Sequence, residues 1–222
     1  MNDRSIPYAK DPGGARAGLA VALVAASALG WMSAAVSRGG LAGPDHALLA
    51  FFAAAQGPMP DAFFQAVTWL GSAYLLVPAT LLLVAWFGWR RQWRAAWLMA
   101  ITYFGATLTA WALKVVIGRE RPVLHPALAD FIRMDWSFPS GHTTHAAAFA
   151  LGLWLLLGDR RPVAGRPAVA ALGGVVLLVA VSRLHLQVHW PSDVLAGLLV
   201  ALFWAGLAAA AVGSGRFPGR LT

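Results

Sequence analysis

The sequence contains no cysteine and very little charge. Its 222 residues include 9 Asp or Glu and 17 Lys or Arg, so that charged residues make up 12% of the chain. Without cysteine the chain has no disulfide, no thiolate nucleophile and no Cys-ligated metal. Because a soluble domain normally carries about 25% charged residues, this shortage excludes a water-soluble enzyme, a disordered chain and a coiled coil.

Hydrophobic residues are abundant instead, and they occur in long uncharged runs. They make up 59% of the chain, and the mean hydropathy is +0.65. The short alternating segments that are typical of a transmembrane barrel are absent. The composition therefore predicts a helical membrane protein that forms one compact bundle.

The uncharged stretches predict an all-α bundle of six transmembrane helices. About 20 helical residues, at ~1.5 Å each, cross the ~30 Å hydrocarbon core. The predicted spans are 17–36, 72–89, 95–113, 141–158, 167–182 and 194–215. Pro44-Asp45 and Pro60-Asp61 indicate helix starts, so short interfacial or lead-in helices are predicted at 45–56 and 62–70. The predicted organisation is one membrane domain, 17–215, between tails at 1–16 and 216–222.

The positive charges favour one side of the membrane. Six spans put both termini on the same side, and that side then holds 11 of the 17 Lys and Arg residues. By the positive-inside rule both termini are predicted to be cytoplasmic, in a bacterial-type inner (plasma) membrane. The net charge of +8 is thus interpreted as a topology signal. A nucleic-acid partner and an obligate protein partner are not predicted.

Ionisable side chains gather at four of the predicted helix ends. Alternation of direction puts the ends of the third and fifth spans and the starts of the fourth and sixth at one outward face. The residues concerned are Lys114, Arg121, His142, Arg183, His189 and Asp193. Ionisable groups at membrane depth are costly and usually functional. For any one of them, the alternative is an interfacial anchor that snorkels to water.

These residue types suit phosphate chemistry. Arginine binds phosphate oxygens with two parallel hydrogen bonds, and lysine adds a point charge. Ser140 can cap the fourth span, whose free N–H groups then form an anion site, and Gly141 lets an oxyanion approach the backbone. An ordinary N-cap is the alternative for that segment alone. Asp193, four residues after His189, can fix the imidazole tautomer and leave the other ring nitrogen as a nucleophile or base.

Together these segments resemble the type 2 phosphatidic acid phosphatase family, which includes lipid phosphate phosphatases and shares its site with vanadium haloperoxidases. The motifs of the family are Lys-x6-Arg-Pro, Pro-Ser-Gly-His and Ser-Arg-x5-His-x3-Asp. They occur in order and without substitution at 114–122, 139–142 and 182–193. The resemblance covers about 114–193, and the six-helix layout extends it to most of the chain.

The resemblance implies a role for each residue. His189 attacks phosphorus and forms a phosphohistidine, Asp193 holds His189, and His142 protonates the leaving oxygen and then activates water. The phosphoryl oxygens are held by Lys114, Arg121, Arg183, Ser140 and the Gly141 backbone. The implied activity is hydrolysis of a lipid phosphate or diphosphate without a metal or other cofactor. Candidate substrates are undecaprenyl diphosphate, phosphatidylglycerol phosphate, phosphatidic acid and diacylglycerol pyrophosphate.

Other interpretations remain open at this level. A zinc site has suitable spacing in the pairs His142–His145 and His185–His189, with Asp193 as a further ligand. It leaves the three cations without a role, and both His145 and His185 are predicted to be packing or supporting residues. A Ser140 hydrolase lacks the Gly-x-Ser-x-Gly elbow. A lipid phosphotransferase uses the same site, whereas a non-enzymatic transporter is expected to have broken helices at the bilayer midplane. The loop at 123–138 is predicted to be solvated, with capping of the site as its alternative role.

Overall fold

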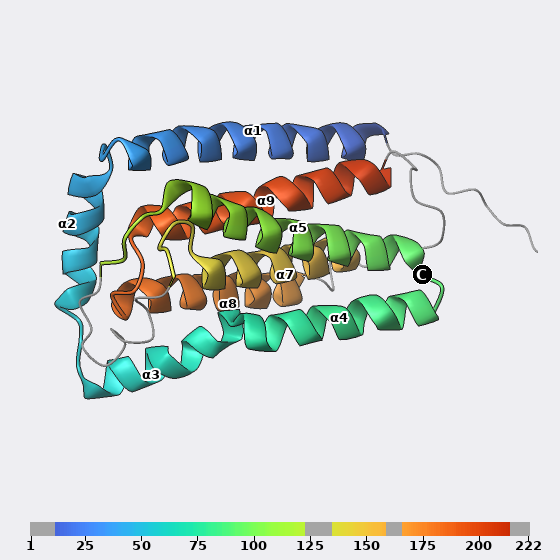
Figure 1. Ribbon diagram of the computed structural model, residues 1–222. Helices are drawn as coiled ribbons and strands as arrows, with labels where there is room; N and C mark the ends of the chain where they lie inside the picture. Colours follow the sequence, from blue (N-terminus) through green and yellow to red (C-terminus); the bar gives the residue numbers. More distant parts are fainter. Residues whose placement is uncertain (1–11, 123–134, 159–165, 214–222) are drawn as a thin grey trace, which may run out of the picture.

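Figure 1 shows the computed structural model of the chain, which describes residues 12–122, 135–158 and 166–213. Every regular element in these ranges is a helix, so the all-α prediction is confirmed for the described residues. Residues 1–11 and 216–222 of the predicted tails lie outside the described residues, as does the larger part of the loop predicted at 123–138.

The helices form a bundle with one helix across its end. Their bounds are Pro12–Ser37 (α1), Ala42–Ala53 (α2), Pro58–Thr68 (α3), Ala73–Trp89 (α4), Trp93–Ile117 (α5), Gly141–Gly158 (α7), Arg166–His185 (α8) and Pro191–Gly213 (α9). The long helices run alongside one another, whereas α2 lies across the end of the bundle (Figure 1). The helix predicted at 45–56 corresponds to α2.

Within the described residues, five helical segments are long and apolar enough to cross a membrane. They are Gly13–Ser37, Pro58–Trp89, Trp93–Ile117, Pro167–His185 and Pro191–Val212. The remaining predicted span, the fourth along the chain, is α7, which has 18 residues. It is less apolar because its first turn contains His142, Thr143, Thr144 and His145. Within the bundle, α7 packs against α5, α8 and α9.

The lead-in helix predicted at 62–70 continues into the next span. α3 is followed directly by a 3-10 turn, Trp69–Gly71, and the apolar segment that begins with α3 and ends with α4 has 32 residues. The helix is interrupted at Ser72, whose ψ of 137° is extended and whose Oγ accepts the Tyr74 N–H at 3.2 Å. Gly71 is required here because a Cβ would lie 2.8 Å from the His142 carbonyl oxygen. The interruption therefore lies directly against the start of α7.

The last helix, α9, packs closely against α1 and also against other helices of the bundle. A Cβ on Gly18 would lie 2.7 Å from the Gly206 carbonyl oxygen, and a Cβ on Gly206 would lie 2.6 Å from that of Gly18. Glycine permits such approach between helices in a membrane, where lipid tails are as apolar as the side chains. α9 also packs against α5 and α7, so it holds together the helices that carry the three sequence motifs.

Candidate active site

The predicted site residues lie at the end of the bundle that α2 crosses. α5 and α8 end there, and α7 and α9 begin there (Figure 1). Hydrogen bonds join the chain that follows α5 to His189 and to Asp193 in the first turn of α9.

The first motif places two cations around one carboxylate. α5 ends at Gly118, whose left-handed conformation (φ 59°) turns the chain after Lys114. Lys114 Nζ donates to Asp135 Oδ2 at 3.0 Å and to the Trp136 carbonyl. Arg121 Nη2 donates to the same carboxylate oxygen at 2.9 Å. The Asp135 side chain is 54% exposed, whereas those of Lys114 and Arg121 are 12% and 9% exposed, so two nearly buried cations share one accessible anion.

His189 has one ring nitrogen beside Arg121. Arg121 Nη1 lies 3.0 Å from His189 Nε2 and also donates to the Val188 carbonyl at 2.9 Å. A guanidinium can only donate, so Nε2 is the acceptor and carries the ring's free lone pair. Burial lowers the pKa of His189 well below its ordinary value, and the charges of Arg121 and Arg183 lower it further. The imidazole is therefore neutral at pH 7, as a nucleophile must be.

The other ring nitrogen of His189 faces Asp193. Nδ1 lies 3.4 Å from Asp193 Oδ2 and 3.3 Å from Ser137 Oγ. The Asp193 carboxylate is fully buried, and it accepts hydrogen bonds from Ser137 Oγ at 2.5 Å and the Trp190 N–H at 2.9 Å on Oδ2. On Oδ1 it accepts from Arg119 at 2.7 Å. These donors fix the carboxylate behind the imidazole.

Two of these partners, Ser137 and Arg119, are not among the predicted site residues. Arg119 is one of three cations in the first motif segment, but it stands at a position that the motif leaves unspecified. Ser137 stands two residues before Pro139, and no local pattern marks it as a partner of Asp193. Both contacts join segments more than 50 residues apart, which spacing along the chain does not reveal.

The start of α7 is joined to the third motif through the backbone. The Ser140 N–H donates to the Asp193 carbonyl at 2.9 Å, and Ser140 Oγ accepts from Thr143 Oγ1 at 3.0 Å. A Cβ on Gly197 would lie 2.9 Å from the Ser140 carbonyl oxygen, so α9 and α7 touch main chain to main chain. Gly141 faces the first motif, because its Cβ would lie 4.0 Å from Lys114 Cε.

Arg183 and His142 complete the predicted set. Arg183 is 8% exposed and donates from Nη1 to Thr68 Oγ1 at 2.6 Å, at the end of α3. The charged neighbours that act on the His142 ring are Arg183, Arg121 and Lys114. The structure thus brings the three cations and both predicted catalytic histidines to one end of the bundle.

The histidines of the alternative zinc pairs have other partners. His185 Nε2 lies 2.8 Å from Asp61 Oδ1, and its ring lies 4.4 Å from that of Phe64. The His145 ring lies 5.7 Å from the Tyr103 ring. Among residues 12–122, 135–158 and 166–213, no three His, Cys, Asp or Glu side chains are grouped as a metal site requires. These contacts are those of packing residues.

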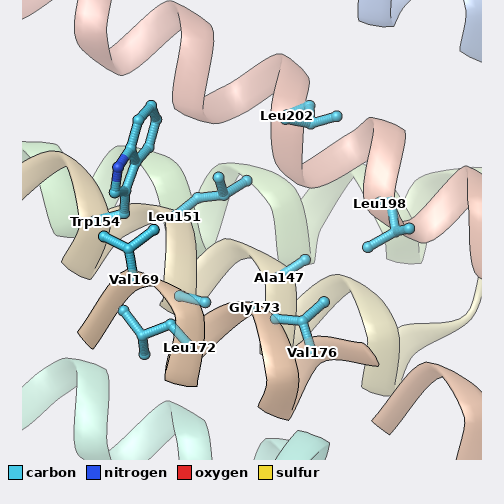
Figure 2. Close-up of a pocket in the computed structure, with 10 residues that line it drawn as sticks. Ala147, Leu151, Trp154, Val169, Leu172, Gly173, Val176, Leu198 and Leu202 are labelled. Atoms are coloured by element: carbon cyan, nitrogen blue, oxygen red, sulfur yellow. The ribbon is translucent and has the colours of Figure 1, made fainter. Parts of the chain in front are cut away.

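An apolar cavity of about 470 Å³ lies between α7, α8 and α9 (Figure 2). It is lined by Ala147, Ala150, Leu151, Trp154, Val169, Leu172, Gly173, Val176, Leu198 and Leu202. Ala147 and Leu198 each come five residues after a predicted catalytic residue, His142 and Asp193 respectively. At 1.5 Å per helical residue, the cavity begins about 7.5 Å below the site and extends along the bundle axis.

Comparison with known proteins agrees with this geometry. Residues 93–215 match the PAP2 superfamily, and since the match covers more than half of the chain, the chain belongs to that superfamily. The match begins with α5 and ends just beyond α9, so it contains every residue of the candidate site. The chain is thus an integral membrane enzyme of the phosphoric monoester hydrolase class.

Named relatives come from several organisms. Phosphatidylglycerophosphatase B of Bacillus subtilis is 28% identical over 175 residues, which cover 77% of this chain and 84% of that protein. Decaprenylphosphoryl-5-phosphoribose phosphatase of Mycobacterium tuberculosis is 35% identical over 131 residues, or 57% of this chain and 64% of the relative. An undecaprenyl-diphosphatase of Sulfolobus acidocaldarius is 29% identical over 135 residues, or 59% of this chain and 60% of the relative.

Two solved structures share the fold. The PAP2 type phosphatidylglycerolphosphate phosphatase of Bacillus subtilis superposes with a TM-score of 0.71 and covers 88% of this chain and 94% of its own, at 24% identity. LpxE of Aquifex aeolicus superposes with a TM-score of 0.57 at 27% identity, covering 74% of this chain and 93% of its own. The helical arrangement of Figure 1 is therefore that of membrane PAP2 phosphatases.

Proposed function

We propose that this chain hydrolyses a lipid phosphate or diphosphate through a phosphohistidine formed on His189. The observation that carries the proposal is the setting of the His189 ring. Nε2 lies 3.0 Å from the Arg121 guanidinium, and Nδ1 faces the buried Asp193 carboxylate. A neutral imidazole oriented by a carboxylate, with its free lone pair beside a cation, is suited to attack an anionic phosphoryl group.

In the first half of the reaction, the His189 Nε2 lone pair forms a bond to phosphorus, and the bond from phosphorus to the lipid oxygen breaks. His142 gives a proton to that leaving oxygen. Lys114, Arg121 and Arg183 neutralise the charge on the phosphoryl oxygens, with the Ser140 and Gly141 segment as a further donor. The phosphoryl group takes the position between Lys114 and Arg121 that the Asp135 carboxylate holds without substrate.

In the second half, His142 accepts a proton from water, and the water oxygen attacks phosphorus. The bond between phosphorus and Nε2 breaks, so that inorganic phosphate leaves and His189 is restored. Asp193 stabilises the Nδ1 proton of His189 throughout both halves. Positive charge directed at the transferring phosphoryl group is the main catalytic device, as in other phosphoryl-transfer sites.

The cavity and the relatives support a lipid as the substrate. The cavity is lined by apolar groups (Figure 2). The helical rise from His142 and Asp193 puts its start just below the candidate site, where the tail of a bound lipid would continue into the bundle. The relatives are named for phosphatidylglycerophosphate, decaprenylphosphoryl-5-phosphoribose and undecaprenyl diphosphate, all phosphorylated lipids. We assign the cavity to the tail and the cation cluster to the phosphate.

The same proposal includes the topology. α7 crosses the membrane as well and brings the number of spans to six, because it packs among α5, α8 and α9 and its polar first turn lies at the candidate site. α2 lies at the membrane interface, both termini are cytoplasmic and the site faces outward. The distribution of Lys and Arg supports this orientation.

Phosphate release from detergent-solubilised protein tests the activity. The panel contains phosphatidic acid, phosphatidylglycerol phosphate, diacylglycerol pyrophosphate and undecaprenyl diphosphate, with His189→Ala as the control. We expect release that persists in EDTA and is blocked by vanadate, which accepts five-coordinate geometry from His189. Loss of activity in EDTA with recovery in Mg²⁺ would contradict the mechanism, and transfer of phosphate to a second lipid would identify a phosphotransferase.

A further inference from the structure

We propose that Arg119 and Asp45, called here the Asp45–Arg119 pair, are positioning residues that hold Asp193 and, through it, the His189 imidazole. The inference rests on the function proposed above for His189 and Asp193. It assigns a positioning role to α2, a helix that lies outside the three sequence motifs and outside the PAP2 match.

Arg119 joins two buried carboxylates that come from opposite parts of the chain. Its Nη1 lies 2.7 Å from Asp193 Oδ1, and its Nη2 lies 2.6 Å from Asp45 Oδ2. The Asp193 and Asp45 side chains are 0% and 3% exposed, and that of Arg119 is 15% exposed. Buried ion pairs require such compensation, because a buried carboxylate without its partner is strongly destabilising.

Asp45 is also bound to the start of α9. Its Oδ1 accepts the Ser192 N–H at 2.9 Å, and its Oδ2 accepts the Ser192 hydroxyl at 2.6 Å. The first N–H groups of a helix have no partner within the helix, so Asp45 supplies the missing acceptor. Ser192 Oγ in turn accepts from Arg119 Nη1 at 2.7 Å. A single network therefore fixes α2, the first turn of α9 and the residue next to Asp193.

The two arginines of the first motif have different surroundings. Arg121 directs Nη1 toward His189 Nε2, the nitrogen proposed to bond phosphorus. Arg119 directs both terminal nitrogens toward carboxylates, and its guanidinium stacks over the Trp190 ring at 5.3 Å. Its contacts thus lie behind the imidazole, on the side of Nδ1. Arg119 is consequently assigned to the carboxylate and Arg121 to the phosphate.

Besides positioning Asp193, the Asp45–Arg119 pair affects the charge of the network behind His189. Two carboxylates share one guanidinium, so the network keeps one net negative charge behind His189. Attack on phosphorus makes the imidazole cationic, and negative charge on the Nδ1 side stabilises that cation. The pair therefore acts in the step that forms the phosphoenzyme, and it acts through Asp193 without touching the substrate.

The test compares Asp45→Asn, Arg119→Lys, the double variant and Arg119→Ala with the wild-type enzyme. Asp61→Asn is the matched control, because it removes the charge from the His185–Asp61 contact of 2.8 Å, which ties α3 to α8 outside this network. The readouts are kcat and KM for p-nitrophenyl phosphate, the rate of phosphoenzyme formation, the pH profile of kcat/KM and the unfolding temperature in detergent.

We expect kcat and phosphoenzyme formation to fall by about 10–100-fold in Asp45→Asn and in Arg119→Lys, the usual effect of losing an outer partner. KM should change little. The double variant should be no worse than the poorer single variant, because both residues act as one unit. In the Arg119 variants the acidic limb of kcat/KM should move to higher pH, and added guanidinium should restore Arg119→Ala.

Three outcomes would overturn the inference. Unchanged kcat and pH profile in Asp45→Asn and Arg119→Lys is the first. A raised KM at constant kcat is the second, since it would place Arg119 on the phosphate. Losses no larger than those of Asp61→Asn at an equal drop in unfolding temperature are the third. A wild-type enzyme without a phosphohistidine refutes the proposed function itself, which is a separate result.

Discussion

At the scale of single residues, Asp135 is placed where the substrate phosphate is expected. Its carboxylate pairs with both Lys114 and Arg121, and its side chain is 54% exposed. We expect Asp135→Asn to strengthen inhibition by phosphate and vanadate about two- to fivefold, the size of a partly exposed ion pair. Inhibition constants measured with p-nitrophenyl phosphate check this, and Glu120→Gln, an exposed carboxylate nearby, controls for net charge. Weaker phosphate inhibition in Asp135→Asn would show that Asp135 assists binding.

Replacing His189 and replacing His142 should have different effects on turnover and on phosphoenzyme formation. His189→Ala should abolish turnover and phosphoenzyme together, because no other group is proposed to bond phosphorus. His142→Ala removes a general acid, which costs about 10²–10⁴-fold, and should still label with a substrate whose leaving group needs no proton. Asp193→Asn should lie between the two. Rapid-quench labelling distinguishes them, and an acid-labile phosphoenzyme in His189→Ala would reverse the assignment.

Residue types and spacing predicted much of the candidate site. They did not predict the contacts between residues that are far apart in the sequence. The three motifs mark Lys114, Arg121, His142 and His189, whose proximity follows once four helix ends share a face. The sequence presents Asp45 only as the start of a short helix. Its partners, Ser192 and Arg119, lie 147 and 74 residues away. Such pairings depend on how α2 crosses the bundle, which local periodicity does not encode.

At the scale of elements, the uncharged runs of the sequence predicted the helix bounds closely. They did not predict how the helices α3 and α4 are joined. The spans predicted at 95–113 and 194–215 correspond to α5 and α9 with differences of a few residues. The segment at 62–70 joins the following span because only Ser72 separates the 3-10 turn from α4. For α7 the difficulty is its composition. The polar groups of its first turn, which lie at the candidate site, lower its mean hydropathy.

The α1–α9 contact offers a paired test of helix packing. A Cβ on Gly18 would lie 2.7 Å from the Gly206 carbonyl oxygen, whereas a Cβ on Gly30 of the same helix meets nothing within 4 Å. We expect Gly18→Val to destabilise the fold by about 1–3 kcal/mol, the usual effect of overpacking, and Gly30→Val to have little effect. Unfolding temperatures in detergent measure both. Equal behaviour of the two variants would mean that α1 does not depend on this close approach.

The cavity between α7, α8 and α9 has a similar matched pair. Gly173 lines the cavity, and neither Gly173 nor its neighbour Gly174 has an atom within 4 Å of an added Cβ. Gly173→Leu should occupy part of the cavity and lower kcat/KM for a long-chain lipid phosphate about 5–10-fold, equivalent to one or two buried methylenes. A dioctanoyl substrate and Gly174→Leu should be much less affected. If Gly173→Leu lowers kcat/KM equally for the long-chain and the dioctanoyl substrate, the lipid tail lies elsewhere.

At the scale of the whole molecule, the orientation in the membrane is the property to measure. Lys and Arg are concentrated on the predicted cytoplasmic side, with 11 of 17 residues. A reporter that functions only in the cytoplasm should therefore be active when fused after Arg220. A reporter inserted at 123–134 should be inactive, because the topology proposed above puts the loop between the third and fourth predicted spans on the outward side. The reverse pattern would place the candidate site inside the cell.

The backbone hydrogen bond between Ser140 and Asp193 has a consequence for how the choice of lipid can change. Because the Ser140 N–H bonds the Asp193 carbonyl at 2.9 Å, and Gly197 seats α9 against that turn, the spacing between the anion site and the carboxylate is set by main chain. Side-chain replacements along the cavity leave this spacing intact. Under the proposed function, replacing residues that line the cavity therefore changes which lipid fits, while the reacting groups keep their spacing.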